Sequence, residues 1–353
     1  MGGDSMQAVG CHLVRHIKDM AFMGITAVLK NIRKVRENFR IARNSLLELR
    51  PDILILVDYP SFNLQIASFC RKHLPSTKIF YYIPPKVWAW KTWRIHRLAR
   101  VCDEILSILP FEPDFYARYG YRATYVGNPT YIHSQLSTKK LPSTLNSQLS
   151  TLNYIALLPG SRKHEVEKCL PRMLEAALKQ EGYQIVIAAV SSLDKQIYDK
   201  ALQPYNGRAD IKLLYDCSGD ILRSASAAVV NSGTATLEAA LAGCVQVAVY
   251  HIGLGYKPIY KLLRPLLFRR IKYFTLVNLI AGREVIQELI AYRFTIDNLA
   301  HELNQLLTDD DMRQKQQDGY KEIAVLLSQT AAPSAAQIVI CSTNQHESPS
   351  SLN

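Results

Sequence analysis

Small and polar residues gather where a strand, a tight turn and a helix follow one another over residues 225–243. The apolar run 227–230 is typical of a buried parallel strand, and Ser232-Gly233-Thr234 interrupts it. Gly233 permits backbone angles that other residues avoid, and Thr234 can cap the helix. The turn then offers backbone N–H groups to a phosphate, and Glu238 can accept hydrogen bonds from sugar hydroxyls. The alternative is an ordinary connection between a strand and a helix.

A second turn of this kind follows the apolar run 154–158. Gly160-Ser161-Arg162 leads into a helix, and the guanidinium fork of Arg162 can bind two phosphate oxygens at once. The alternative for Arg162 is an ion pair with Glu165 on the same helix. Two such turns in one stretch of alternating strands and helices predict that Ser161, Arg162 and the turn 232–234 hold the phosphates of one ligand.

Asp58 is the candidate catalytic carboxylate. It directly follows the apolar strand 53–57, and α/β enzymes place reacting groups at the carboxyl ends of such strands. The alternative is that Asp58 caps the next helix, which we expect over residues 62–72. Spacing alone does not choose between the two.

An aromatic loop is expected after the strand 78–83. Residues 84–90 read Pro-Pro-Lys-Val-Trp-Ala-Trp, and a third tryptophan follows at position 93. Prolines and indole rings in this number predict a rigid loop at the carboxyl edge of the sheet, suited to a sugar or an acyl group. The alternative is a packed aromatic corner.

Apolar runs that alternate with helical patterns predict an α/β fold with two Rossmann-like domains. The expected strands are 53–57, 78–83, 104–108, 154–158, 185–190, 211–214, 227–230 and 245–249, of which the last ends the second sheet. Between the sheets, Ser-Gln-Leu-Ser-Thr at 134–138 recurs at 147–151, which indicates a linker or an insertion. We therefore expect domains at 1–132 and 154–328, a linker at 133–153 and a disordered tail at 329–353.

The composition is that of a globular protein of 353 residues, with 48% hydrophobic and 20% charged residues. The net charge of +12 predicts a polyanionic partner, which can be a nucleic acid, an acidic membrane surface or a phosphorylated substrate. No nucleic-acid-binding motif accompanies the charge. The seven cysteines are scattered without CxxC spacing, which indicates reduced thiols in a cytosolic protein and no structural zinc. No apolar run is long enough to span a membrane.

Two segments combine basic and apolar faces. In residues 25–47, apolar side chains recur every three or four positions of a predicted helix, and Lys and Arg occupy its other faces. Residues 256–272 mix basic, aromatic and aliphatic side chains in the same way. Together they predict peripheral contact with anionic lipid. The alternative is that each segment is a core-facing helix with a solvated basic side.

Eight short segments are spread over most of the chain. They are AFMGI at 21–25, VDYPSFN at 57–63, PPKVWAW at 84–90, LPFE at 109–112, YVG at 125–127, LLPGSR at 157–162, SGTATLE at 232–238 and NLIAGRE at 278–284. In sequence and in order they resemble the lipid-A-disaccharide synthases, which are inverting glycosyltransferases of the GT-B type. Each segment alone is a weak signal, whereas eight in order are specific.

The resemblance implies a reaction of lipid A biosynthesis that joins UDP-2,3-diacylglucosamine to 2,3-diacylglucosamine 1-phosphate (lipid X) and releases UDP. It implies no cofactor, no metal, no nucleic-acid partner and a peripheral place at the inner face of the cytoplasmic membrane. Asp58 matches the family's essential strand-end aspartate. Asn278 and Arg283 match its nucleotide-side loop, and we expect them in a loop and a helix start. The oligomeric state is left open, with a homodimer among the choices.

The sequence also departs from the family's pattern. The family opens with a strand and a Ser-Gly-Asp turn that nothing here matches, and its Gly-His-Pro is Gly127-Asn128-Pro129 in this chain. We therefore expect an incomplete N-terminal domain that lacks its first strands, and little or no activity of the chain as written. The alternatives are another GT-B UDP-sugar enzyme, an inactive fragment that binds only UDP or membrane, and a non-catalytic basic protein.

Overall fold

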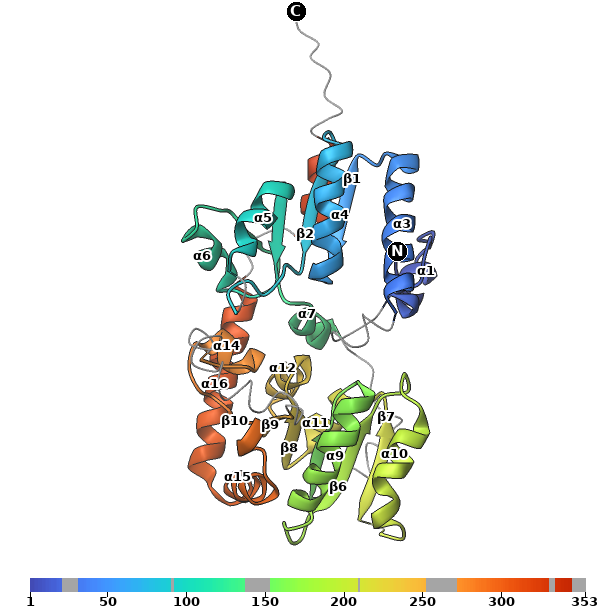
Figure 1. The fold of residues 1–353 in the computed structure, drawn as a ribbon. Helices are drawn as coiled ribbons and strands as arrows, with labels where there is room; N and C mark the ends of the chain where they lie inside the picture. The colour runs from blue at the N-terminus through green and yellow to red at the C-terminus, as the bar shows by residue number, and fades with distance from the viewer. Residues whose placement is uncertain are drawn as a thin grey trace, which may run out of the picture. The chain divides into compact units, whose positions relative to one another are not determined.

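The computed structural model describes residues 1–20, 31–89, 92–136, 153–208, 210–251, 272–329 and 334–344. The described helices and strands form two compact units (Figure 1). The first unit contains Met1–Val126 and Ala331–Asn353, and the second contains Gly127–Thr330. The chain therefore leaves the first unit once and rejoins it near the C-terminus.

A parallel sheet in the order β1-β2-β3-β4 lies in the first unit. Its strands are β1 (Ile53–Val57), β2 (Lys78–Tyr82), β3 (Glu104–Ser107) and β4 (Thr124–Tyr125). Val57 pairs with Tyr82, and Tyr82 pairs with Leu106, so the carboxyl ends of the first three strands lie at one edge. The described helices of this unit are α1 (Asp4–Ala8), η1 (Ile17–Asp19), α3 (Ile32–Leu49), α4 (Pro60–His73), α5 (Arg94–Val101), α6 (Glu112–Ala117) and α17 (Ala335–Asn344).

Different parts of the chain cover the two faces of this sheet. Side chains alternate along a strand, so Leu56 of β1 packs with α3, α4 and α5, whereas Phe80 and Leu106 face the other side. There they contact Ile338 and Val339 of α17. The expectation of a disordered tail over 329–353 is therefore wrong for residues 335–344. The few apolar residues of this segment recur at helical spacing and shield a sheet face from water.

The second unit holds a parallel sheet in the order β10-β9-β8-β5-β6-β7. Its strands are β5 (Tyr154–Leu158), β6 (Gln184–Ala189), β7 (Ile211–Tyr215), β8 (Ala227–Asn231), β9 (Gln246–Tyr250) and β10 (Gln287–Ile290). This is the strand order of a doubly wound Rossmann sheet. The expected strands are present, but 245–249 does not end the sheet, because β10 pairs with β9. The sequence of β10, Gln-Glu-Leu-Ile, lacks the apolar run by which the other strands were predicted.

Helices cover both faces of the second sheet. The described helices are α7 (Pro129–Leu136), α9 (Lys163–Ala177), α10 (Lys195–Leu202), η2 (Gln203–Tyr205), α11 (Ser218–Ser224), α12 (Thr234–Leu241), α14 (Leu276–Ala281), η4 (Ala291–Arg293), α15 (Ile296–Thr308) and α16 (Asp310–Ser328). Ile155 and Leu157 of β5 pack into one core with residues of α9 and α15. Tyr154 and Ala156 pack into another with residues of α11 and α12. The middle of this sheet is thus buried on both faces, which gives its strands their continuous apolar sequences.

Three predicted segments fall partly outside the described residues. The basic helix expected over 25–47 is described from Ile32 onward, and nearly all of 256–272 lies outside. Of the linker expected at 133–153, the structure describes residues 133–136, which belong to α7, and residue 153. Because α7 packs against α12, the division between the units falls after Val126 rather than at that linker.

Candidate active site

The two phosphate-binding turns predicted from sequence meet at the middle of the second sheet. β5 and β8 are neighbours, with Leu158 paired to Val230 near their carboxyl ends. From β5 the chain continues to β6 on one side, and from β8 to β9 on the other. Open α/β sheets bind ligands at this reversal of strand order. The turns after β5 and β8 therefore share one candidate ligand site.

Gly160 allows these two turns to approach closely. Its φ of +110° is a backbone angle that L side chains rarely adopt. A Cβ at this position would collide with the Glu165 carboxylate and would come within 2.8 Å of Asn231 Nδ2. Asn231 ends β8, so a side chain at Gly160 would push apart the two loops that form the site.

Arg162 lies immediately before α9, at its N-cap position. Its Nη1 donates to Glu165 Oε1 at 2.9 Å, which is the ion pair that the sequence offered as the alternative. The Arg162 side chain is half-exposed and the Glu165 side chain is largely buried. A guanidinium has five N–H donors, so this pair anchors Arg162 at the helix start and is compatible with a second, anionic partner.

The turn after β8 differs in detail from the prediction. Gly233, not Thr234, is the N-cap of α12, and its φ of 169° is extended backbone that any residue can adopt. Ser232 N–H donates to the carbonyl of Val249, so the backbone donors available at this helix start come from later residues. Thr236 Oγ1 in turn donates to the carbonyl of Gly233 at 2.8 Å. The N-terminus of α12 is present where the sequence predicted an anion site. The backbone angle of Gly233, however, does not require glycine at this position.

Glu238 lies one turn into α12. Burial raises its pKa above the usual range, and hydrogen bonding by Ser218 and the charge of His133 oppose that shift. Ser218 Oγ lies 3.5 Å from Glu238 Oε2. The carboxylate is thus held beside the candidate site in surroundings that strengthen its hydrogen bonds.

Asn278 is placed differently from the prediction. It lies within α14, fully buried, and not in a loop. Its Oδ1 accepts hydrogen bonds from the N–H groups of Val285 and Ile286, at 2.7 and 3.0 Å. Its Nδ2 donates to the carbonyl of Ile286 and to Glu288 Oε1, both at 2.9 Å. These four bonds use the whole hydrogen-bonding capacity of an amide, so Asn278 ties its own segment together.

Glu288 is the partner of Asn278 that sequence reasoning missed. Its carboxylate accepts the N–H groups of Phe274 and Thr275, the Thr275 hydroxyl and the Asn278 amide. Glu288 lies in β10, the strand that was also missed, so no signal in the sequence pointed to it. Arg283 follows the C-cap Gly282 and donates to Glu322 at 2.6 Å, with both side chains about half-exposed. The buried network therefore fixes the segment that presents Arg283.

Asp58 stands at the carboxyl edge of the first sheet. Its N–H donates to the carbonyl of Tyr82, and its own carbonyl accepts from Tyr81 Oη and from Asn63 Nδ2. The N-cap of α4 is Tyr59, with no side-chain cap, so Asp58 does not cap that helix. Asp58 and Tyr59 both have a φ of 45°. Backbone strain of this kind concentrates at functional sites, and here it presents an exposed carboxylate.

The aromatic loop after β2 lies at the same edge. Val87 is buried, and Trp88 Nε1 donates to Glu112 Oε1 at 3.0 Å. The Trp88 ring meets Phe111 edge-on, with centroids 5.3 Å apart. The loop is therefore both an aromatic corner and a rigid wall next to the strand that Asp58 follows.

The described residues contain no cluster of three or more His, Cys, Asp or Glu that could hold a metal ion. In the same residues, no helix is both long and apolar enough to cross a membrane.

The sequence of this chain was compared with known protein families and with known proteins. Residues 1–341 match the model of the lipid-A-disaccharide synthetase family. This chain belongs to that family. The lipid-A-disaccharide synthase of Acidobacterium capsulatum is 31% identical over 367 residues, which cover 96% of this chain and 86% of the relative. The lipid-A-disaccharide synthase of Trichlorobacter lovleyi is 34% identical over 322 residues, which cover 88% and 80%.

A solved structure supports the fold of this family member. The UDP-GlcNAc 2-epimerase from Neisseria meningitidis bound to UDP-GlcNAc is similar with a TM-score of 0.61, covering 96% of this chain and 87% of that one. The two sequences are 10% identical, so the likeness concerns the fold alone. It confirms the predicted α/β architecture with two Rossmann-like units.

Proposed function

We propose that this chain joins UDP-2,3-diacylglucosamine to 2,3-diacylglucosamine 1-phosphate, giving the β-1,6-linked disaccharide 1-phosphate and UDP. The observation that carries the proposal is the pair of helix-start turns after β5 and β8, at the reversal of strand order in a lipid-A-disaccharide synthetase family member. The first unit supplies the acceptor site and the second unit supplies the UDP site.

The second unit holds the donor through its diphosphate. As the bond between the sugar and the phosphate breaks, UDP leaves with the electron pair and gains negative charge. The N-terminus of α12 and the Arg162 guanidinium stabilise that charge without a metal ion. Ser161 and Thr234 lie in the same two turns, and Glu238 accepts hydrogen bonds from hydroxyls of the donor.

Asp58 acts as the general base on the acceptor. Its carboxylate takes the proton of the 6-hydroxyl while that oxygen attacks the anomeric carbon of the donor. A single displacement inverts the anomeric carbon and needs no covalent enzyme intermediate. The exposed carboxylate at a strand end, and the absence of a side-chain cap on α4, support this role.

Asn278 and Arg283 serve the nucleotide side in different ways. Asn278 acts through the backbone of residues 285 and 286, which its amide holds in place. Arg283 lies at the end of the same segment with a half-exposed guanidinium, and it is the member of the pair that contacts the nucleotide.

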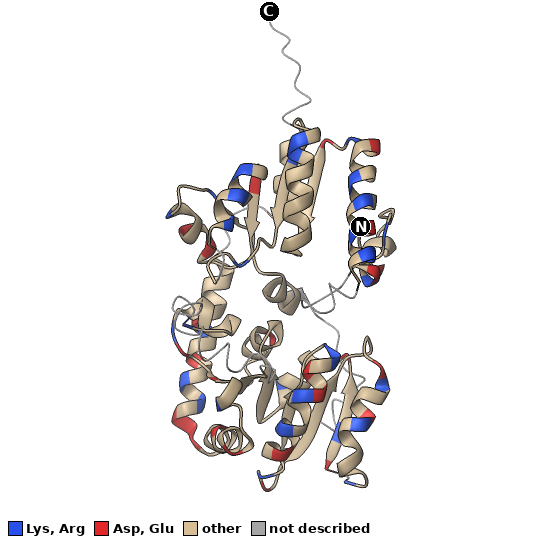
Figure 2. Ribbon diagram, viewed as in Figure 1, with Lys and Arg blue, Asp and Glu red and all other residues tan. Residues whose placement is uncertain are grey.

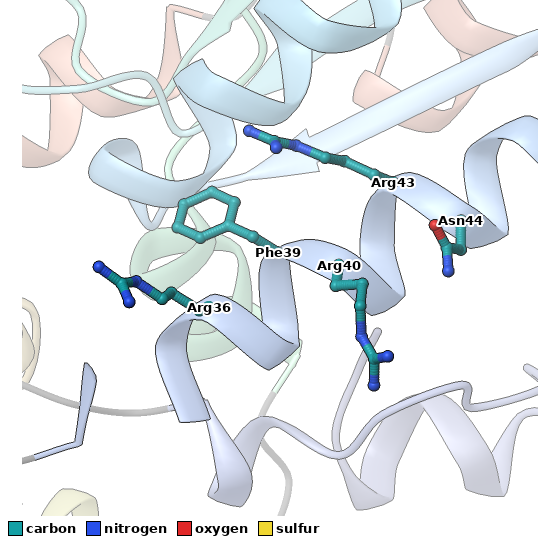
Figure 3. Close-up of a pocket in the computed structure, with 5 residues that line it drawn as sticks. All are labelled: Arg36, Phe39, Arg40, Arg43 and Asn44. Carbon is teal, nitrogen blue, oxygen red and sulfur yellow. The ribbon is translucent and has the colours of Figure 1, made fainter. Parts of the chain in front are cut away.

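The α3 surface places the enzyme on an anionic membrane. Lys and Arg recur on α3 from Arg33 to Arg43 (Figure 2). A groove of about 380 Å³ is lined by Arg36, Phe39, Arg40, Arg43 and Asn44. In Figure 3, Arg36 and Arg43 extend on either side of the Phe39 ring. Basic side chains around a partly buried ring suit the headgroup layer of the inner face of the cytoplasmic membrane.

Vesicle sedimentation tests this placement. Replacing the three groove arginines by glutamine should weaken binding to vesicles with anionic lipid, and added salt should weaken binding of the parent protein. The control replaces three exposed lysines of the second unit by glutamine: Lys163, Lys195 and Lys200. Equal binding by both triple variants would refute α3 as the contact surface.

Disaccharide formation from the two lipid substrates tests the reaction itself. Asp58→Asn should lower turnover by about 10²–10⁴-fold, the usual contribution of a general base, with UDP affinity unchanged. The control is Asp52→Asn, an exposed carboxylate at the other end of β1. Turnover of Asp58→Asn within a few-fold of the parent would exclude the base role. A parent chain that neither forms the disaccharide nor binds UDP would exclude the function, whereas UDP binding without turnover would match the little or no activity expected of the chain as written.

A further inference from the structure

Glu112 is a buried carboxylate in the first unit that the proposed reaction does not use. It opens α6 and is 2% exposed. Its Oε1 accepts the Trp88 indole N–H at 3.0 Å, and its Oε2 accepts the N–H of Leu109 at 3.2 Å. Burial raises the pKa of Glu112 to about 7, although these bonds and the charge of Lys86 favour the ionised form.

The two bonds join two loops at one sheet edge. Trp88 belongs to the loop after β2, and Leu109 belongs to the loop after β3. The loop after β2 begins at Ile83, with a φ of 59°, and passes through buried prolines at 84 and 85. It is thus held at its start by packing and near its end by the Trp88 side chain, which also rests edge-on against Phe111.

The chemistry of this contact calls for a carboxylate. The Trp88 indole approaches Oε1 and the Leu109 N–H approaches Oε2, and the Ile108 N–H also hydrogen-bonds to this carboxylate, so both oxygens must be acceptors. A glutamine of the same volume would turn an NH₂ group toward one of the donors and leave that donor unpaired. Burying a carboxylate is costly, so packing alone would favour an apolar or amide side chain here.

The clamped loop lies next to the proposed base. β1 and β2 are neighbours, with Val57 paired to Tyr82, and the N–H of Asp58 donates to the carbonyl of Tyr82. Asp58 and the loop at 83–89 therefore leave adjacent strands at the same edge. A shift of this loop would change the wall beside Asp58 without touching the carboxylate.

We propose that Glu112 is a positioning residue for the acceptor substrate. By holding the Trp88 indole, it keeps the loop at 83–89 in the conformation that binds the acceptor next to Asp58. This inference rests on the proposed function, because it takes the first unit as the acceptor side. It assigns Glu112 no proton transfer and no contact with either substrate.

Three variants separate this role from simple packing. Glu112→Gln keeps the volume and removes one acceptor, and Trp88→Phe keeps a ring against Phe111 and removes the donor. The control is Asp114→Asn, which removes an exposed carboxylate from the same helix. In a ¹H–¹⁵N spectrum, loss of one indole resonance in Trp88→Phe assigns that signal, and Glu112→Gln should shift the same signal while Asp114→Asn leaves it in place.

Steady-state kinetics then test the effect on the acceptor. Glu112→Gln and Trp88→Phe should each raise the KM for the acceptor about tenfold, the scale of one charge-assisted hydrogen bond. The KM for UDP-2,3-diacylglucosamine should stay within about twofold, and the double variant should be no worse than either single one. If Glu112 only stabilised the fold, the variants would lower the melting temperature, and the KM for the acceptor would change no more than the KM for UDP-2,3-diacylglucosamine.

The outcomes that overturn the inference differ from those that overturn the function. An unmoved indole signal in Glu112→Gln, or an acceptor KM unchanged within twofold, rejects the positioning role while the parent enzyme remains active. If the parent neither forms the disaccharide nor binds UDP, the proposed function fails. Titration of the acceptor in detergent then decides the inference alone, and equal affinity for the parent and Glu112→Gln would reject it.

Discussion

Replacing Asn278 by aspartate would test whether this residue is an internal clamp or a nucleotide ligand. The two amide donations, to the carbonyl of Ile286 and to Glu288 Oε1, are both 2.9 Å long. Asn278→Asp keeps the shape and the two accepted bonds and removes both donations. It also brings a second carboxyl group into contact with Glu288 at a fully buried position.

The cost can be worked out from these contacts. An introduced carboxyl that stays protonated can replace one of the two donations, so its cost is about one hydrogen bond, or about 1 kcal/mol. When ionised it is a buried charge against a like charge, and a folded-state pKa raised by about three units costs about 4 kcal/mol at neutral pH. Because folding raises this pKa, the cost is small below about pH 4 and grows as the pH rises toward the raised value. We expect a loss of roughly 3–5 kcal/mol at pH 7.5.

Denaturant unfolding at several pH values, with calorimetric UDP titration on the folded protein, measures both effects. The control is Asn304→Asp on the exposed face of α15, where the same chemical change should cost little at any pH. Asn278→Asp should approach the parent in stability, to within about 1 kcal/mol, near pH 4 and bind UDP there. A variant that stays fully stable at pH 7.5 but loses UDP affinity would refute the clamp and make Asn278 a direct ligand.

Three further predictions follow from the same structure. Arg162→Ala should weaken UDP binding by about 1.5–3 kcal/mol, as loss of a charged hydrogen bond would; calorimetry measures it, and Lys163→Ala, which should bind normally, is the control. Gly160→Ala should cost about 2–4 kcal/mol of stability, from its positive φ and the collision with Glu165; Gly207→Ala has a positive φ but open space and should cost less in the same denaturant assay. Burial raises the pKa of Glu112 from its ordinary 4.5 to about 7, so the parent should lose stability relative to Glu112→Gln as pH rises through this window, by on the order of 3 kcal/mol. A difference between these two proteins that does not change between pH 4.5 and 7 would contradict the last prediction.

Sequence predicted the parts of this molecule that are encoded locally. Strands such as β5 are buried on both faces and therefore read as unbroken apolar runs. The turns at 159–162 and 232–234 were recognisable because glycine and small polar residues separate a strand from a helix. For Arg162 the sequence offered a phosphate ligand and an ion pair with Glu165, and the ion pair is present.

Features that depend on contacts between distant segments were missed. β10 is an edge strand with two polar residues, and it is defined by its pairing with β9. Glu288 matters because it reaches Thr275 and Asn278, and Glu112 matters because it reaches Trp88. In each case one carboxylate accepts hydrogen bonds from a segment that folds back onto it. The spacing of residues along the chain does not predict such contacts.

The return of α17 to the first unit bears on how this protein is made. A ribosome delivers the residues of β1 to β4 first, yet Phe80 and Leu106 stay without their cover until Ile338 and Val339 have been synthesised. Lys78 likewise meets its partner, the carbonyl of Ser342, 264 residues later. The whole second unit can be completed during that interval, since its strands and helices lie between the two halves of the first. The first unit is therefore synthesised first but is completed last. Until then the nascent chain exposes an apolar face of the first sheet, which needs protection from aggregation.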